Sequence, residues 1–270
     1  MKSILARLAF ISLSLAFICL LTDDINAEIK PESIAGIWLL DEGQGDTVWD
    51  SSPNRNHGKF SDSKGIKWVD GKFGKALEFD GTDYVIIKHS PSLDQNDVIT
   101  IALWFKGNSI GNYPSLIYKG TVGEPGYWGL HEMPGSNLVY ARIDTAGGIN
   151  QTSGRMDNVV DEEWHHIVFV LDNGVVRMFR DGEELPEIAF NHGDGFGNND
   201  ELGIGSGFYP QDPRALDGII DELGIFNVAL TLEDVQNIMN NGFKKALGAS
   251  ISVNANGKLA DSWGNLKIQN

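Results

Sequence analysis

Short runs of apolar and β-branched residues, each ended by a turn, recur along most of this 270-residue chain. Glycine is abundant, at 32 residues, and indicates many tight turns. Short strands at intervals of roughly 8–12 residues are typical of a β-sandwich or barrel. We therefore predict an all-β fold with strands near 36–40, 75–79, 84–88, 98–106, 115–119, 127–133, 138–143, 165–171, 175–180, 201–205 and 218–226.

Two hairpin turns and one short C-terminal helix can be placed more closely. Asn-Gly within Asp172-Asn173-Gly174 predicts a tight hairpin, and Asp181-Gly182 predicts a second turn directly after it. Thr231 can cap a helix with Asp234 at its third position; Val235, Ile238 and Met239 then share one face, and Gly242 can end the helix. No long linker or charge run divides 33–246, so we expect one domain.

The two ends of the chain differ from this pattern. Lys2 and Arg7 followed by the apolar run Leu8 to Leu21 predict a signal peptide over 1–27, because the run is shorter than the ~20 residues of a membrane span. The mature chain would then be secreted, extracellular or periplasmic, and would have no transmembrane segment. A lipoprotein anchored through Cys19 is the alternative. Residues 247–270 predict an edge hairpin or a short docking segment around Asn254 to Gly257.

Charge and cysteine content exclude several functions. There are 21 Lys and Arg residues against 37 Asp and Glu residues, a formal net charge of −16, which argues against binding to nucleic acid. The one cysteine lies in the predicted signal peptide, so the mature chain has no intrachain disulfide, cysteine zinc site or thiol nucleophile.

Five segments in order resemble the laminin-G-like, concanavalin A-like jelly-roll family, in a secreted bacterial form. The resemblance covers about 33–246, and the whole domain is assigned to 28–246. It implies two antiparallel sheets packed face to face. The segments are Gly36 to Gly43 with Asp50-Ser51-Ser52 and Asn56-His57-Gly58; Gly74 to Gly81 with Asp83-Tyr84-Val85; Ile99 to Phe105; Trp164-His165-His166; and Asp217 to Phe226 leading into Ala229-Leu230-Thr231.

Strand alternation predicts a ligand groove. In 98–106, Ile99, Ile101, Leu103 and Phe105 share a core face, which turns Trp104 outward; in 138–144, Val139, Ala141 and Ile143 do the same, which turns Tyr140, Arg142 and Asp144 outward. If both strands lie in one curved sheet, these outward residues lie together. Tyr127 on 127–133 could join them, although both sides of that strand carry similar residues and its pattern does not show which side faces outward. Aromatic rings beside hydrogen-bonding groups suit an extracellular carbohydrate.

A calcium site is the second expectation. Calcium takes 6–8 oxygen ligands, which short acidic turns can supply, and Asp80 and Asp83 flank Gly81-Thr82 in one such turn. The resemblance favours Asp80 and Asp221 as ligands, with Asp83 and Asp41 as further candidates. Side-chain to backbone bonds that only shape the turn are the alternative interpretation.

Catalysis is not expected. Glycosidases need two facing carboxyl groups ~5–9 Å apart, and in Asp217 to Glu222 the alternation separates Glu222 from the other acids. The prediction is a non-catalytic module that binds extracellular carbohydrate. A protein–protein or cell-adhesion module without a sugar ligand is the alternative, and a polysaccharide hydrolase is the third.

Overall fold

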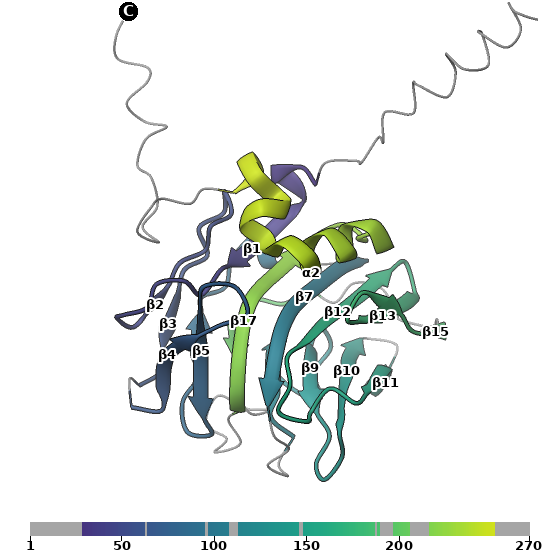
Figure 1. The fold of residues 1–270 in the computed structure, drawn as a ribbon. Coiled ribbons are helices and arrows are strands. Elements are labelled where there is room, and N and C mark those ends of the chain that lie inside the picture. Colours follow the sequence, from purple (N-terminus) through teal and green to yellow (C-terminus); the bar gives the residue numbers. More distant parts are fainter. Residues whose placement is uncertain are drawn as a thin grey trace, which may run out of the picture.

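Two antiparallel β-sheets stack face to face and enclose one large apolar core (Figure 1). The computed structural model describes residues 29–251 except 63, 95–96, 108–112, 146–147, 187, 190–196 and 206–215. The predicted signal peptide with Cys19, and residues 252–270 of the predicted tail hairpin, lie outside the described residues.

The first sheet, sheet A, has the strand order β14-β13-β12-β7-β17-β5-β4, with β1 beside β17 and β15 beside β13. Its strands are β1 (Ile34–Trp38), β4 (Ile66–Asp70), β5 (Lys75–Asp80), β7 (Val98–Gly107), β12 (His165–Asp172), β13 (Val175–Arg180), β14 (Glu183–Glu184), β15 (Ile188–Ala189) and β17 (Asp217–Phe226).

The second sheet, sheet B, has the order β11-β10-β9-β8-β16-β6-β3-β2. Its strands are β2 (Thr47–Val48), β3 (Gly58–Phe60), β6 (Val85–Ile87), β8 (Ser115–Lys119), β9 (Trp128–Glu132), β10 (Leu138–Thr145), β11 (Gly148–Asp157) and β16 (Leu202–Ile204). Three short 3-10 helices, η1 (Pro31–Ser33), η2 (Pro91–Leu93) and η3 (Gly248–Ser250), complete the described elements together with one α-helix.

Alternation along the strands builds the core between the sheets. The predicted inward residues of β7 and β10 are all buried there, among them Leu103 and Phe105 from sheet A and Val139 from sheet B. The hairpin prediction is also confirmed: β12 and β13 are joined by Asn173 and Gly174, both with positive φ, as a type I′ turn requires.

Helix α2 (Leu232–Leu247) covers part of the outer face of sheet A (Figure 1). Thr231 and Asp234 form the predicted capping box, and Val235 and Ile238 pack against Ala102 and other outward residues of sheet A. The predicted end at Gly242 is only partly right. Gly242 has φ 68° and breaks the helical path there, but helical residues resume and continue to Leu247.

The two ends of the described chain lie side by side. The hydroxyl of Ser250 donates a hydrogen bond to the carbonyl of Ile29, at 2.9 Å. Among the described residues, no helix has the length and apolar character needed to cross a membrane.

Candidate functional site

A pocket opens on the outer face of sheet B, the face opposite the one that α2 covers. Its cavity volume is about 160 Å³, below the ~300–1,000 Å³ of pockets for drug-sized ligands. Strands β6, β8 and β16 form its floor, and two loops form its rim. The lining residues are Tyr84, Ile86, Tyr118, Gly120, Thr121, Asp200, Glu201, Leu202 and Gly203.

The floor of the pocket depends on a tyrosine and a glycine on neighbouring strands. Tyr118 points outward from β8 because its neighbour Ile117 fills the core. Gly203 on β16 pairs with Tyr118, and a Cβ atom at this position would lie 2.2 Å from the Tyr118 ring. Glycine at position 203 therefore lets the ring lie across β16. Tyr118 is 4 % exposed, so only a small part of it borders the pocket.

The rim of the pocket is acidic. Asp200 and Glu201 are exposed and precede β16, while Tyr84 precedes β6 on the other side. Burial raises the pKa of the Tyr84 phenol, and the negative charges of Glu201 and Asp83 raise it further. The phenol therefore stays protonated and can donate a hydrogen bond, while the carboxylates can accept hydrogen bonds from ligand hydroxyls.

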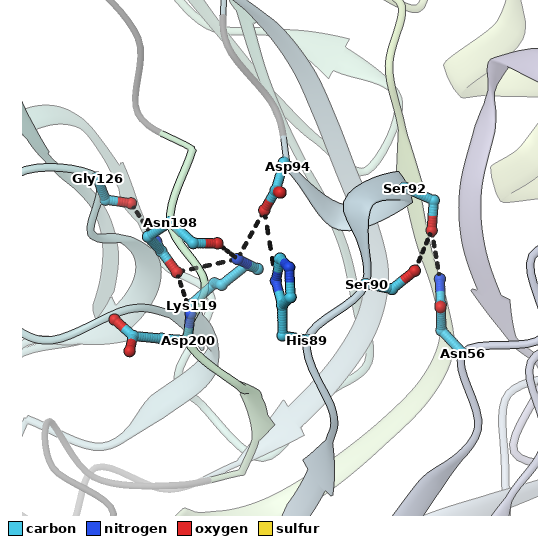
Figure 2. A network of polar contacts seen from close by, with 9 residues as sticks. All are labelled: Asn56, His89, Ser90, Ser92, Asp94, Lys119, Gly126, Asn198 and Asp200. Atoms are coloured by element: carbon cyan, nitrogen blue, oxygen red, sulfur yellow. Dashed lines mark hydrogen bonds and ion pairs between the residues drawn. The ribbon is translucent and has the colours of Figure 1, made fainter.

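Two rim segments, residues 120–126 and 197–201, are joined beneath the pocket by a buried lysine (Figure 2). Lys119 Nζ lies 3.0 Å from Asp94 Oδ1 and 2.9 Å from Asn198 Oδ1, and it also donates to the Asn198 carbonyl. Asn198 Nδ2 donates to the carbonyl of Gly126, at 2.6 Å, and Asp200 N donates to Asn198 Oδ1, at 2.9 Å. His89 lies 3.7 Å from Asp94 on its other side.

Three of the predicted groove residues form a packed layer beside the pocket. Tyr127 is fully buried and Tyr140 is 6 % exposed, and both pack with Tyr118. Arg142 binds Asp144 through Nε and Nη2, the shortest contact being 2.8 Å, and Asp144 Oδ2 accepts from Gly123 N. These residues support the 120–126 segment and do not line the pocket.

A histidine is buried within the same layer. Its ring lies between two hydroxyl groups and forms a hydrogen bond with each. His131 Nδ1 is 2.7 Å from Ser115 Oγ, and Nε2 is 2.8 Å from the Tyr127 hydroxyl. Burial lowers its pKa to about 3, and the nearby Arg142 adds to this shift. A neutral, fully buried imidazole that bridges two hydroxyls holds the layer together and has no access to a ligand.

The structure does not bring Trp104 and Tyr140 together. The groove required both strands to lie in one sheet, but β7 belongs to sheet A and β10 to sheet B, so the two side chains point to opposite outer faces. Trp104 is 5 % exposed, because Lys72 Nζ lies 4.1 Å above its ring and Phe73 packs at 6.3 Å. The expected single groove is therefore not formed by these residues.

The four predicted calcium ligands fall into two separate places. Asp80 and Asp83 shape one turn: Asp80 Oδ1 accepts from the Thr82 hydroxyl at 2.6 Å, and Asp83 Oδ2 accepts from Gly65 N at 2.7 Å. Asp80 pairs with Asp217 on β17, four residues or about 13 Å from Asp221. Among the described residues, no three His, Cys, Asp or Glu side chains are grouped so that they could hold a metal ion.

Asp221 and Asp41 do lie near each other. Asp221 Oδ2 accepts from Phe73 N at 2.9 Å, and Asp41 Oδ1 accepts from Lys75 N at 2.8 Å, so both hold the turn between β4 and β5. Burial raises the pKa of Asp221 to about 7, with a contribution from Asp41. Asp221 Oδ1 is buried and has no hydrogen-bond partner.

The residues of the pocket were not singled out from the sequence. Tyr84 and Tyr118 lie in segments predicted as strands, but nothing local shows that β6, β8 and β16 are neighbours. Asp200 precedes the segment 201–205 that was predicted as a strand, and Glu201 is its first residue, so neither acid was marked as a ligand residue. The feature that marks the pocket is an outward tyrosine opposite a glycine on the neighbouring strand. It can be recognised only once the pairing of β8 with β16 is known.

Two stacked antiparallel sheets, with a helix on one outer face and a pocket on the other, define a jelly-roll β-sandwich. A sequence model of the concanavalin A-like lectin/glucanase superfamily (laminin G type) matches residues 79–236, more than half of the chain. The chain belongs to this superfamily. A search of curated proteins found no match.

Solved structures share the fold at low sequence identity. Domain 4 of AbnA, an extracellular arabinanase from Geobacillus stearothermophilus in complex with arabinotriose, has a TM-score of 0.58 and 21 % identity over 77 % of this chain and 98 % of that one. The binding domain of Paraclostridial Mosquitocidal Protein 1 has a TM-score of 0.63 and 14 % identity, over 79 % of this chain and 53 % of that one.

A third similar structure is the botulinum neurotoxin serotype D ligand binding domain in complex with N-acetylneuraminic acid. Its TM-score is 0.61 and its identity 11 %, over 79 % of this chain and 52 % of that one. The chain thus spans about half the length of the two toxin domains. At these identities the likeness establishes the fold.

Proposed function

We propose that this protein is a secreted, non-catalytic module that binds extracellular carbohydrate through the pocket on sheet B. The observation that carries the proposal is a pocket in which two tyrosines, the half-buried Tyr84 and the largely buried Tyr118, lie beside a carboxylate rim, Asp200 and Glu201. A sugar ring offers an apolar face to an aromatic ring and a hydroxyl edge to acceptors. Structures of the same fold that hold arabinotriose and N-acetylneuraminic acid support the ligand class.

The carboxylates that line the pocket on sheet B support the non-catalytic part of the proposal. Hydrolysis of a glycosidic bond needs two carboxyl groups on opposite sides of that bond. Asp200 and Glu201 are consecutive residues on one side of the pocket. Asp221 and Glu222 are buried, and Glu222 Oε2 accepts from Phe243 N, so neither is open to a substrate.

A glycan array with neutral and acidic oligosaccharides, followed by calorimetry with the best ligand, tests the binding. The variant Glu201→Gln should weaken binding about tenfold or more, because a hydrogen bond to a charged acceptor contributes ~1.5–3 kcal/mol. Glu124→Gln, at an exposed position in the loop 120–126, is the matched control and should bind normally. If the wild-type protein retains no glycan, the proposal is overturned in favour of a protein–protein or cell-adhesion module.

Calcium binding is a separate proposal, carried by the unpartnered, buried Asp221 Oδ1 beside Asp41. A cation there would satisfy this oxygen and stabilise the turn between β4 and β5. Millimolar calcium should raise the melting temperature of the wild-type protein above its value in EDTA, and should leave Asp221→Asn unchanged. Equal melting temperatures of the wild type in both conditions would rule the ion out.

A further inference from the structure

The ammonium group of Lys119 is buried where the two rim segments of the pocket meet the chain after η2. Lys119 is the last residue of β8, and its side chain is 1 % exposed, directly after the tyrosine that forms the pocket floor. The strand therefore delivers Tyr118 to the pocket and Lys119 to the layer beneath it. Figure 2 shows Asp94 and Asn198 converging on the ammonium from two sides.

The partners of Lys119 are the oxygens that a bound metal ion would take. An ammonium has three donors, and three oxygens face this one: a carboxylate oxygen of Asp94, the main-chain carbonyl of Asn198 and its side-chain amide oxygen. Carboxylates, carbonyls and amide oxygens are also the ligands that calcium prefers. Here a covalently attached cation occupies the centre of such a set.

The contacts around the ammonium extend to both rim segments. Asn198 is oriented by Lys119, and it in turn binds the Gly126 carbonyl and the Asp200 amide. Gly126 ends the 120–126 segment, and Asp200 belongs to the 197–201 segment. Loss of the ammonium would take the buried donor from the Asp94 carboxylate and from the Asn198 carbonyl, and would leave Asn198 Oδ1 with the Asp200 amide alone.

We propose that Lys119 is a positioning residue that acts as a built-in cation, so that the rim of the pocket is ordered without a metal ion. The role in ligand binding rests on the proposed function, whereas the ordering of the rim does not. Two consequences follow: removal of the ammonium should loosen both rim segments, and an added cation should restore them.

Hydrogen exchange read by mass spectrometry tests the ordering without any ligand. Lys119→Met removes the charge and keeps the length of the side chain, and exchange over 120–126 and 197–201 should accelerate about tenfold or more while the core strands stay protected. Lys59→Met is the control, because Lys59 is an exposed lysine of the same sheet that pairs with Asp46. Unchanged exchange in both segments would overturn the proposal.

Asn198→Ala is the second variant, in case Lys119→Met does not fold. It removes the amide that joins Lys119 to Gly126, and it should loosen the same two segments. Protection equal to that of the wild type would count against the network.

Rescue distinguishes a cation from a mere space-filler. In Lys119→Ala, n-propylammonium or millimolar calcium should slow exchange in the two rim segments again, while n-propanol should not. Calcium should leave exchange in these segments of the wild type unchanged, because the ammonium occupies the position. Rescue by n-propanol alone would show that packing, and not charge, orders the rim.

The ligand arm uses the glycan with the highest affinity on the array. Lys119→Met should lose about tenfold or more in affinity, and wild-type affinity should be equal in EDTA and in calcium. If no glycan binds the wild type, the proposed function fails and the exchange experiment still decides the role of Lys119. If a glycan binds equally well to wild type and Lys119→Met, the proposed function stands and the positioning role is refuted.

Discussion

Asp50 shows how a single buried carboxylate organises a loop. Its two oxygens accept from Ile37 N at 2.9 Å, Ser52 N and Oγ at 2.8 Å, and Asn56 N at 2.7 Å. The motif Asp50-Ser51-Ser52 contributed to the family resemblance without an assigned role, and the structure supplies one. The carboxylate holds residues 50–56 against strand β1.

Asp50→Ala should therefore lower the free energy of unfolding by about 3 kcal/mol or more, because several buried N–H groups lose their acceptor together. Urea denaturation followed by tryptophan fluorescence measures the change. Asp46→Ala is the comparison: Asp46 is 61 % exposed and pairs only with surface groups, so the change should stay within about 0.5 kcal/mol. Equal losses for both variants would contradict the structural role of Asp50.

For the candidate site, the sequence predicts the direction in which single side chains point but not which strands lie side by side. Alternation correctly turned Trp104, Tyr140 and Arg142 away from the core. It could not show which sheet each strand joins, because pairing between distant segments such as β8 and β16 leaves no local mark. The outward aromatic residues were expected to be open to ligand, yet loops and neighbouring side chains cover them.

At the scale of elements, the capping box of α2 gives a direct test. Thr231 Oγ1 accepts from Asp234 N at 3.1 Å, and Asp234 Oδ2 accepts from Thr231 N at 2.9 Å. Thr231→Ala should destabilise the protein by about 1 kcal/mol, as is usual for a lost N-cap. Thermal unfolding measures it, and Thr231→Ser should retain the cap and most of the stability. A Thr231→Ala variant as stable as wild type would show that packing alone holds α2 on sheet A.

Apolar strands were predictable from the sequence, and polar strands were not. Strands such as β7 and β12 carry a core residue at every second position, which the sequence displays openly. Strands β2, β3, β4, β11, β14 and β15 were missed. Strand β4, for example, pairs only with β5 and so lies at the edge of sheet A. Its residues Lys67 and Asp70 are exposed, so the sequence of this strand has only a weak apolar pattern.

At the scale of the whole molecule, buried acids such as Glu132 link stability to pH. Glu132 on β9 is fully buried, and neither of its carboxylate oxygens has a hydrogen-bond partner. Burial raises its pKa to about 8, and the charge of Asp217 adds to the shift. The folded protein therefore keeps the proton up to about pH 8, whereas the unfolded chain loses it near 4.5, the ordinary pKa of a glutamate side chain.

Because the folded state binds more protons between these two values, stability should fall as the pH rises from about 5 to about 8, by roughly 1 kcal/mol per pH unit from this group. Chemical denaturation at several pH values should show this slope reduced in Glu132→Gln. Glu163→Gln, at an exposed position, should leave the slope unchanged. A Glu132→Gln protein with the wild-type slope would show that other groups cause the pH dependence.

The hydrogen bond between Ser250 and Ile29 fixes how the protein would be presented when it is attached to something else. Both ends of the described chain leave the sandwich from one place, and the chain between them closes into a loop. A support coupled to either end would therefore hold the molecule at the same point. For residues 29–251, biosensor immobilisation through an N-terminal or a C-terminal tag should then give the same orientation, and the two attachments should report the same affinity for a glycan.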